Sequence, residues 1–530
     1  MKYLEGTQVN SIFYNGHTNE PDWEFPTEKI AVLAPNPVKH VVDFARRNGM
    51  EFFYSIRMND THAAYFPPNR GYWVPFRLQH PELLLGYISQ EHWEKKYLPW
   101  VMKFIRLEEQ RAQQGKTPSN VLPSESELRR QVVAENPLKD VLDRRGLASR
   151  DLWSWPAYNY ALEGTRAHFL EVVEGICQRY DVDGVELDWI RMPMFFKLGE
   201  QRRNIPIMND FVHQVRRRLD HFAQQKGRPI LLAVRVPDSM ELCLAVGLDP
   251  ETWTEQGWVD LLMAGSGLMP FSIPMKEWVE LGQRHEVPVY GCLDRIHPLF
   301  RTGRPKFDVR DPAITNDDPS NYDAVRAAAH RFWQEGVDGI YLYDWHTHHG
   351  PTDPEDFGTV PRLAEPAELA HGNKLYQVDP DFPVRPGQGA LADACYPAQI
   401  PRALTTVSGV AGVEFTLNVS DAPNSIDQAI LLIQWKGDVD QRRVRWTLNG
   451  TAVSEASSEH GREWMDLQSG FPPGVERSGP SQESWIGLQL PGNLIRKGPN
   501  SLELSVEPAQ QGDPSVPVEL LQVRLSTSRA

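Results

Sequence analysis

The chain lacks the features that mark several common classes of protein. It has no Lys/Arg-rich run and a formal net charge of −15, which argue against nucleic acid or an anionic membrane as a partner. No apolar run approaches the roughly 20 residues of a membrane span. Its four cysteines show neither metal-ligand spacing nor the density of a disulfide framework. The composition therefore favours a large soluble enzyme with no cofactor or metal evident from the sequence.

The start of the chain does not predict a signal peptide. The first residues, from Met1 to Glu5, lack the apolar core of a signal peptide. We expect either a cytoplasmic protein or a secreted or periplasmic one whose leader has been removed.

Strand-like and helical patterns alternate along the first part of the chain. The eight strand-like runs are Ser11–Tyr14, Glu51–Asn59, Leu152–Tyr160, Gly184–Trp189, Ile230–Val236, Trp258–Ala264, Val287–Asp294 and Gly339–Trp345. Eight such units in series predict an α/β fold of the (β/α)8 TIM-barrel type. A doubly wound sheet usually carries a glycine-rich phosphate loop after its first strand, and no such loop occurs there.

The chain divides into two predicted domains. Residues 1–375 form the barrel, with an insertion around 63–150 over its mouth, because the connection after the second strand is too long for one helix. Residues 376–530 form an antiparallel β-sandwich. Its predicted strands are Val413–Val419, Ala429–Trp435, Arg443–Leu448, Trp485–Leu490, Ser501–Val506 and Val518–Leu525.

A hairpin signal, Asn449-Gly450, lies among these later strands. The sandwich is either a brace for the barrel or a carbohydrate-binding accessory. We favour the brace, since no surface platform of aromatic side chains can be identified from the sequence.

The run YDVDGVELDWIR, from Tyr180 to Arg191, carries the strongest functional signal. Successive side chains of a strand alternate between faces, so Glu186 and Asp188 share one face of an otherwise apolar strand. Burying ionised carboxylates is costly unless they are paired, and a functional site is one reason to keep them there. The alternative is a structural ion pair inside the barrel.

The same alternation selects the side chains that face the barrel interior. In each strand, the more uniformly apolar set of alternating residues is expected to face the helices. Active sites of such barrels lie at the carboxyl ends of the strands. The inward-facing polar residues found near strand ends are Arg57, Asn59, Asp188, Arg235 and Asp294.

Two carboxylates from different strands at one barrel mouth suit glycoside hydrolysis, in which one acts as the acid and the other as nucleophile or base. Asp188 and Asp294 are the predicted pair. Arg57 and Arg235 could hold one of them ionised. Glu186 is a third catalytic candidate one layer deeper, where a role as partner of Arg235 is favoured over direct chemistry.

Several segments resemble the glycosyl-hydrolase-like (β/α)8 families, namely hypothetical glycosyl-hydrolase-like family 10 and its relatives. The matching segments are YNYA at 158–161, Arg166, the run 180–191, FYSIRMND at 53–60, HPE at 80–82 and GLD at 247–249. The resemblance spans most of the barrel. It implies a carbohydrate-active enzyme, usually exported, with a trailing β-sandwich.

The fourth predicted strand is also similar to the chitinase signature Asp-Gly-x-Asp-x-Asp-x-Glu. Asp183 matches its first Asp, Glu186 replaces the second and Asp188 matches the third. Ile190 stands where the catalytic Glu would be. A substrate-assisted chitinase mechanism is therefore not expected.

The loop DWHTHH, at 344–349, adds polar groups after the last barrel strand. Its histidines could bind a divalent metal, but no partner motif occurs elsewhere, so no metal site is predicted. Contacts with sugar hydroxyls, or a role as general acid, are the other readings. The predicted substrate-binding residues are Arg57, Asn59, His62, Tyr160, Arg191, Arg235, Tyr343, Trp345 and His346.

Three functions remain open. The favoured one is a glycoside hydrolase acting on a poly- or oligosaccharide. The others are a non-catalytic glycan-binding barrel and a polysaccharide lyase that uses His346, Tyr343 and Arg191. The expected partner is a carbohydrate substrate, and the sequence does not specify the sugar, the linkage or the oligomeric state.

Overall fold

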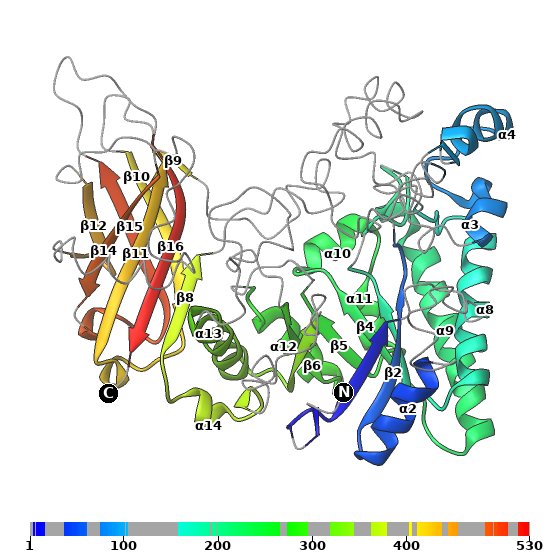
Figure 1. The fold of residues 1–530 in the computed structure, drawn as a ribbon, viewed down its shortest axis with the longest axis horizontal. Coiled ribbons are helices and arrows are strands. Elements are labelled where there is room, and N and C mark those ends of the chain that lie inside the picture. The colour runs from blue at the N-terminus through cyan, green and yellow to red at the C-terminus, as the bar shows by residue number, and fades with distance from the viewer. Residues whose placement is uncertain are drawn as a thin grey trace.

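The chain folds into one parallel sheet flanked by helices, followed by two antiparallel sheets (Figure 1). The residues that this computed structural model describes are 4–5, 7–15, 37–60, 75–100, 102–103, 106, 157–190, 193–197, 199–265, 273–294, 319–343, 362–378, 402–404, 411–436, 444–453, 483–490, 492–506 and 518–528.

The parallel sheet contains seven strands in the described part of the chain. They lie side by side in sequence order, and every neighbouring pair is parallel. The strands are β1 (Ser11–Asn15), β2 (Glu51–Arg57), β3 (Gly184–Asp188), β4 (Leu231–Val236), β5 (Leu261–Ala264), β6 (Val289–Asp294) and β7 (Gly339–Tyr343). Each coincides with a predicted strand, which confirms the α/β class and the parallel order.

The sheet curls, so that its first and last strands approach each other. Phe13 of β1 stacks on Phe53 of β2 with ring centroids 4.4 Å apart. The same ring meets Tyr341 of β7 edge-on at 5.0 Å, although β1 and β7 are the two ends of the sheet order. These three rings therefore close the interior of the sheet.

One predicted barrel strand is wrong. The expected third strand, Leu152–Tyr160, would lie between β2 and β3, but these two pair directly, with Arg57 opposite Asp188. Within this segment only residues 157–160 are described. Tyr158 forms an isolated antiparallel bridge with Leu84 instead. Ala157, Tyr158 and Tyr160 are buried outside the sheet, and an apolar pattern alone does not distinguish such burial from membership of a strand.

Helices cover the outer face of the parallel sheet. α9 shows why they form there: Phe211, Val215 and Leu219 repeat at helical spacing and are fully buried, and Gly227 ends the helix in the left-handed region. The main helices are α2 (Pro37–Arg47), α8 (Glu163–Arg179), α9 (Ile205–Lys226), α10 (Met240–Val246), α11 (Pro250–Glu255), α12 (Lys276–His285), α13 (Pro319–Glu335) and α14 (Pro366–Leu369).

Part of the predicted insertion is helical. The short helices between β2 and β3 are α3 (Pro75–Gln79), η4 (Pro81–Leu83), α4 (Gln90–His92) and η5 (Trp93–Tyr97). Residues 61–74 and 107–156 lie outside the described residues. That the insertion covers the barrel mouth stays a prediction.

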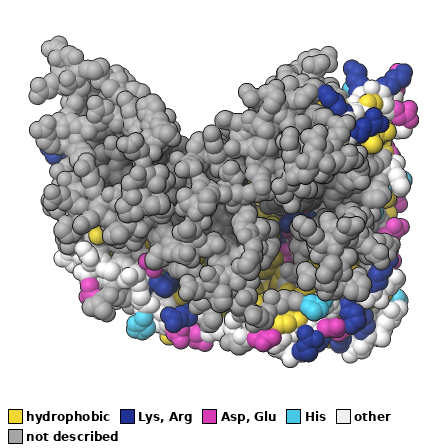
Figure 2. Space-filling view, viewed as in Figure 1, with side chains coloured by type: hydrophobic (Ala, Val, Ile, Leu, Met, Phe, Trp, Pro, Cys, Tyr) yellow, Lys and Arg dark blue, Asp and Glu magenta, His cyan; other side chains and the backbone are white. Residues whose placement is uncertain are grey.

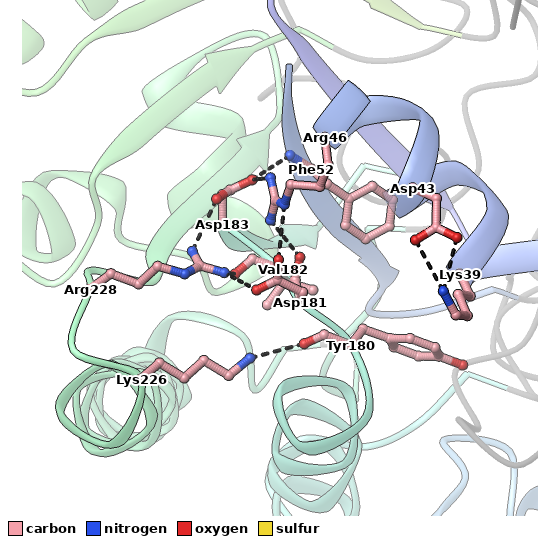
Figure 3. A network of polar contacts seen from close by, with 10 residues as sticks. All are labelled: Lys39, Asp43, Arg46, Phe52, Tyr180, Asp181, Val182, Asp183, Lys226 and Arg228. Carbon is pink, nitrogen blue, oxygen red and sulfur yellow. Dashed lines mark hydrogen bonds and ion pairs between the residues drawn. The ribbon is translucent and has the colours of Figure 1, made fainter. Parts of the chain in front are cut away.

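A network of charges fixes the amino-terminal end of β3 (Figure 3). Asp183 accepts hydrogen bonds from Arg46 of α2, from Arg228 ahead of β4, and from the backbone N–H of Phe52 in β2. Asp181 pairs with the same two arginines. Two carboxylates and two guanidinium groups thus hold β3 between its neighbours, at the end of the sheet opposite the catalytic end of such folds.

The second half of the chain forms two antiparallel sheets. One has the order β10-β15-β12-β13, and the other has the order β14-β11-β16-β8, with β9 also paired to β16. The strands are β8 (Lys374–Val378), β9 (Arg402–Leu404), β10 (Ala411–Val419), β11 (Gln428–Lys436), β12 (Val444–Leu448), β13 (Thr451–Ala452), β14 (Glu483–Leu490), β15 (Gly498–Val506) and β16 (Val518–Ser528). All six predicted strands are present, and β8 crosses the predicted boundary at residue 375.

The predicted hairpin turn is present between β12 and β13. Asn449 and Gly450 both have positive φ, 52° and 79°, as a two-residue turn of this hand requires. The two antiparallel sheets contribute side chains to one buried cluster, for example Phe415 and Leu504 from one sheet and Ile433 and Leu525 from the other.

Helix α13 connects this cluster with the parallel sheet, and Figure 1 shows it beside β8. Ala327 of α13 belongs to the buried cluster of the antiparallel sheets. Nδ1 of His330 is 2.8 Å from Oγ of Ser420, and Gln334 donates a hydrogen bond to the Ser420 carbonyl. α13 therefore packs against both halves of the chain.

The exposed surface carries charges of both signs. In the space-filling view, basic and acidic side chains of the described residues are interspersed along the lower rim (Figure 2). Among the described helices, none combines the length and the apolar character needed to cross a bilayer.

The network around Asp183 predicts a stability effect. Asp183→Asn keeps the shape of the side chain but removes charge from hydrogen bonds to two arginines, so the free energy of unfolding should fall by about 2 kcal/mol. Urea denaturation measures it. Asp43→Asn, which breaks an exposed pair with Lys39 on α2, is the control and should leave the free energy of unfolding nearly unchanged. Equal losses in the two variants would contradict the structural role of Asp183.

A buried ion pair in the second half gives another prediction. Nζ of Lys374 in β8 lies 2.8 Å from Oδ1 of Asp421, and neither side chain has any exposed surface. Asp421→Asn removes the negative charge beside this buried ammonium, and we expect a loss of about 3 kcal/mol in unfolding free energy. The double variant Lys374→Met with Asp421→Leu should recover most of it. A double variant that is no more stable than Asp421→Asn would show that the loss does not come from the charge of Lys374.

Candidate active site inside the parallel sheet

Alternate residues of the parallel strands pack on opposite faces of the sheet. Outward residues such as Ile56, Leu187 and Val234 belong to the core beneath the helices. A separate buried cluster fills the interior, and its members are Phe53, Ala233, Leu261, Met263, Cys292, Tyr341 and Tyr343. This separation confirms the predicted alternation.

The interior polar residues lie in two neighbouring rows of the sheet. Arg57, Asp188 and Arg235 are paired in register across β2, β3 and β4. Ser55 and Glu186 are paired in the row nearer the amino ends of the strands. The structure thus brings five of the predicted site residues together: Arg57, Glu186, Asp188, Arg235 and Tyr343.

Arg235 is the centre of this group, and its side chain is 1 % exposed. Its Nη2 is 2.6 Å from Oδ2 of Asp188, and its Nε is 3.7 Å from Oε1 of Glu186. The guanidinium carbon lies 3.9 Å from the centre of the Tyr343 ring, a cation–π contact. Burial opposes the charge of Arg235, but Asp188 and the two tyrosines raise its pKa well above the usual value, so the group stays a cation.

Glu186 is completely buried and has three polar neighbours. Ser55 donates a hydrogen bond of 2.9 Å to Oε1, and the Tyr341 hydroxyl donates one of 3.0 Å to Oε2. Burial raises the pKa of Glu186 from 4.5 to about 7; Arg235 opposes the rise and Asp188 adds to it. Glu186 therefore carries a proton over much of the range below neutral pH.

Asp188 lies at the carboxyl end of β3 and is 1 % exposed. Its Oδ1 accepts a hydrogen bond of 3.0 Å from the backbone N–H of Ile190, and its Oδ2 accepts the one from Arg235. The neighbouring Arg57 pairs at 2.9 Å with Asp60, which is also buried. Asp188 is therefore bonded to Arg235, and Asp60, just beyond the end of β2, is bonded to Arg57.

The Arg235 guanidinium retains hydrogen-bonding capacity. In the described part of the chain, neither Nε nor Nη1 has a hydrogen-bond partner, although both atoms are buried. Such donors can bind an oxygen of a ligand or of water. A carboxylate held by this cation can serve as a nucleophile or as a stabiliser of positive charge.

Two predicted substrate-binding residues have structural contacts instead. Tyr160 lies in the outer core, where its hydroxyl donates to the Met58 carbonyl and its ring meets those of Phe169 and Trp189, so it offers no stacking surface to a sugar. The side chain of Asn59 bonds the backbone N–H and carbonyl of Tyr158. The sequence did not reveal these contacts because both partners are distant along the chain.

The remaining predicted residues are described in part or not at all. Asp294 ends β6, in register with Tyr343 of β7, but its side chain lies outside the described structure. His62, Arg191, Trp345 and His346 also lie outside it. Among the described residues, no group of three or more His, Cys, Asp or Glu side chains could hold a metal ion.

The sequence analysis missed three polar participants, Ser55, Asp60 and Tyr341. The available signal was strand alternation, since Ser55 is two residues from Arg57 and Tyr341 is two residues from Tyr343, which puts each pair on one face of its strand. Nothing in the sequence indicated that a tyrosine of β7 reaches a carboxylate of β3, since this contact depends on the curl of the sheet.

No protein-family model matches the chain, and no curated protein matches it. Among solved structures, a glycoside hydrolase family 18 N-acetylglucosaminidase from Paenibacillus barengoltzii is 15% identical, covering 26% of this chain and 46% of that one, with a TM-score of 0.19. A chitinase from Rhizomucor miehei is 10% identical, covering 67% of this chain and 93% of that one, with a TM-score of 0.34. An α-amylase from Anoxybacillus is 11% identical, covering 89% and 80%, with a TM-score of 0.30.

The chain thus spans less than half of the N-acetylglucosaminidase that it matches. All three proteins are glycoside hydrolases by name. At TM-scores of 0.19 to 0.34 these similarities carry no argument about the fold or the reaction of this chain. Both rest on the geometry of its own residues.

The raised pKa of Glu186 predicts how stability depends on pH. The unfolded protein releases this proton near pH 4.5 and the folded protein near pH 7, so the stabilising contribution is complete below pH 4.5 and is lost as pH rises to 7. Glu186→Gln cannot ionise. The free energy of unfolding of Glu186→Gln minus that of the unmodified protein should therefore increase by about 2–3 kcal/mol between pH 4.5 and 8. Urea denaturation at each pH measures this difference. A stability difference that does not change with pH would show that Glu186 titrates normally.

Proposed function

We propose that the chain is a glycoside hydrolase that cleaves a poly- or oligosaccharide with two carboxylates at the carboxyl ends of its parallel strands. The observation that carries this proposal is the position of Asp188. It ends β3 at the carboxyl edge of the sheet, where barrel enzymes place their catalytic groups, and a buried guanidinium holds it.

Asp188 is the proposed nucleophile. Arg235 stabilises its negative charge, and the N–H of Ile190 fixes the orientation of the carboxylate. In a retaining reaction, an oxygen of Asp188 bonds to the anomeric carbon as the glycosidic bond breaks, and water then hydrolyses the glycosyl ester. A nearby acid gives the departing oxygen its proton and later removes one from the water.

Asp294 is the proposed acid. Its backbone pairs with that of Tyr343, whose ring lies against the guanidinium of Arg235, and this register brings the end of β6 toward the same interior. Carboxyl groups about 5–5.5 Å apart would indicate a retaining reaction, and about 6.5–9.5 Å an inverting one. A greater separation would remove Asp294 from the pair.

The other parts of the proposal follow from the sequence. The seven described strands belong to a (β/α)8 barrel within residues 1–375 whose eighth strand is not the segment Leu152–Tyr160, and the two antiparallel sheets form a β-sandwich that braces it. Arg57, Arg235 and Tyr343, with His62, Arg191, Trp345 and His346, contact the sugar. Membership of glycosyl-hydrolase-like family 10, or of a relative, and export from the cytoplasm remain part of the proposal.

The reaction can be tested on a panel of polysaccharides with reducing-sugar and ultraviolet readouts. A hydrolase releases reducing ends without ultraviolet absorbance, whereas a lyase produces an absorbing unsaturated product. A glycan-binding barrel releases neither. Absorbing products, or binding without any product, would overturn the proposed hydrolase.

Replacement of Asp188 tests the proposed nucleophile. Asp188→Asn should lower turnover by about 10²-fold or more. Because this change also leaves Arg235 without its partner, Asp188→Glu provides a second variant that keeps the charge and displaces the carboxylate by one methylene. It should also lose most turnover, while retaining a melting temperature close to that of the unmodified protein.

The matched control is Asp181→Asn, which also removes a carboxylate from arginine pairs, but ahead of the amino end of β3. We expect its turnover to stay within about twofold of the unmodified protein, since it lies far along the strand from the reacting end. A folded Asp188→Asn variant with full turnover would show that this carboxylate takes no part in the chemistry.

A further inference from the structure

The geometry points to Glu186 as a positioning residue, which acts on Asp188 through the guanidinium of Arg235 that both carboxylates share. This role is distinct from that of a group that touches the substrate. Its effect on turnover rests on the proposed function, whereas its effect on Asp188 does not.

Glu186 is buried below the carboxyl edge of the sheet, where the substrate is proposed to react. Its side chain has no exposed surface, and it lies one row nearer the amino ends of the strands than Asp188. Both of its oxygens accept hydrogen bonds from protein side chains, Ser55 and Tyr341. A substrate bound at the carboxyl edge therefore meets Asp188 before it could reach Glu186.

Arg235 contacts the two carboxylates unequally. It lies 2.6 Å from Asp188 but 3.7 Å from Glu186, and only the first contact is a hydrogen bond. A neutral Glu186 exerts little pull on the cation, so Arg235 remains on Asp188. An ionised Glu186 attracts the same cation, because two carboxylates then compete for it in a buried site.

Among the described residues, the charged and titratable groups around Glu186 and Arg235 come from five strands of the sheet. They are Arg57 of β2, Asp188 of β3, Arg235 of β4, Cys292 of β6, and Tyr341 and Tyr343 of β7. Arg57 is bonded to Asp60, and burial raises the pKa of Tyr341 well above its usual value. Arg235 is thus the cation that responds when Glu186 loses its proton.

The direction of the pH effect follows from these contacts. Below the pKa of Glu186, which is about 7, the proton stays on Glu186 and Arg235 stays with Asp188. As pH rises through this value, Glu186 becomes negative, the cation is divided between two carboxylates, and Asp188 is held less firmly. Turnover should accordingly decline above pH 7 for a reason that does not involve loss of a reacting proton.

Carbon-13 NMR of protein labelled at the carboxyl carbons of Asp and Glu tests this without a substrate. Spectra of Glu186→Gln and Asp188→Asn assign the two resonances. We expect the Glu186 resonance to titrate near pH 7 and the Asp188 resonance to move at the same pH. In Glu186→Gln the movement of Asp188 should be absent.

Tyr341→Phe provides a graded control, because it removes one hydrogen bond that favours ionised Glu186. The pH at which the Glu186 resonance titrates should rise, and the change in the Asp188 resonance should move to the same higher pH. Titration of Glu186 near pH 4.5, or an Asp188 resonance that does not respond to Glu186, overturns the proposal.

The second test measures kinetics on a glycan that the polysaccharide panel identifies as a substrate. Glu186→Gln should keep kcat within about tenfold at pH 6 and lose the decline of kcat above pH 7, whereas removal of a reacting acid costs about 10²–10⁴-fold. A loss in Glu186→Gln as large as that in Asp188→Asn at every pH would make Glu186 a reacting group and overturn the positioning role. If no glycan is cleaved, the proposed function fails, and the NMR result still decides the coupling.

Discussion

The structure depends on keeping the guanidinium of Arg235 buried in the middle of the parallel sheet. A buried cation needs counter-charges and polar groups close by, and here they come from two strands: two carboxyl groups of β3 and two tyrosine rings of β7. Only a curled sheet brings β7 opposite β4. The same contacts therefore close the interior and build the candidate site, so a change that disturbs the cation disturbs both.

Much of this arrangement was predictable because strand alternation is a local property. The period of two in β2, β3 and β4 placed Arg57, Asp188 and Arg235 on the inner face, and the structure confirms that placement. Parallel order followed from the alternation of strands with helices. The register that puts these three side chains in one row could then be anticipated from their common position near strand ends.

Other features depend on contacts that a local pattern does not contain. Tyr160 has the composition of a stacking residue, yet its hydroxyl bonds Met58 and its ring fills the outer core. The apolar segment that ends at Tyr160 resembled a barrel strand, but β2 and β3 pair without it. The bond from Tyr341 to Glu186 joins residues 155 positions apart and depends on how strongly the sheet curls. Contacts between residues so far apart in the sequence depend on tertiary packing, which cannot be derived from a single sequence.

The order of the strands in the five-stranded antiparallel sheet has a consequence for biosynthesis. β8 lies next to α13 but pairs with β16, which comes far later in the sequence, so a ribosome releases β8 long before its partner exists. Until then β8, with Tyr376 and Val378 of the buried cluster, lies against α13 without the later strand that it pairs with. Contacts of such long sequence separation form late and leave apolar surface open in the meantime. The nascent chain should therefore be a client for chaperones until β16 has emerged, even though the parallel sheet could already have formed.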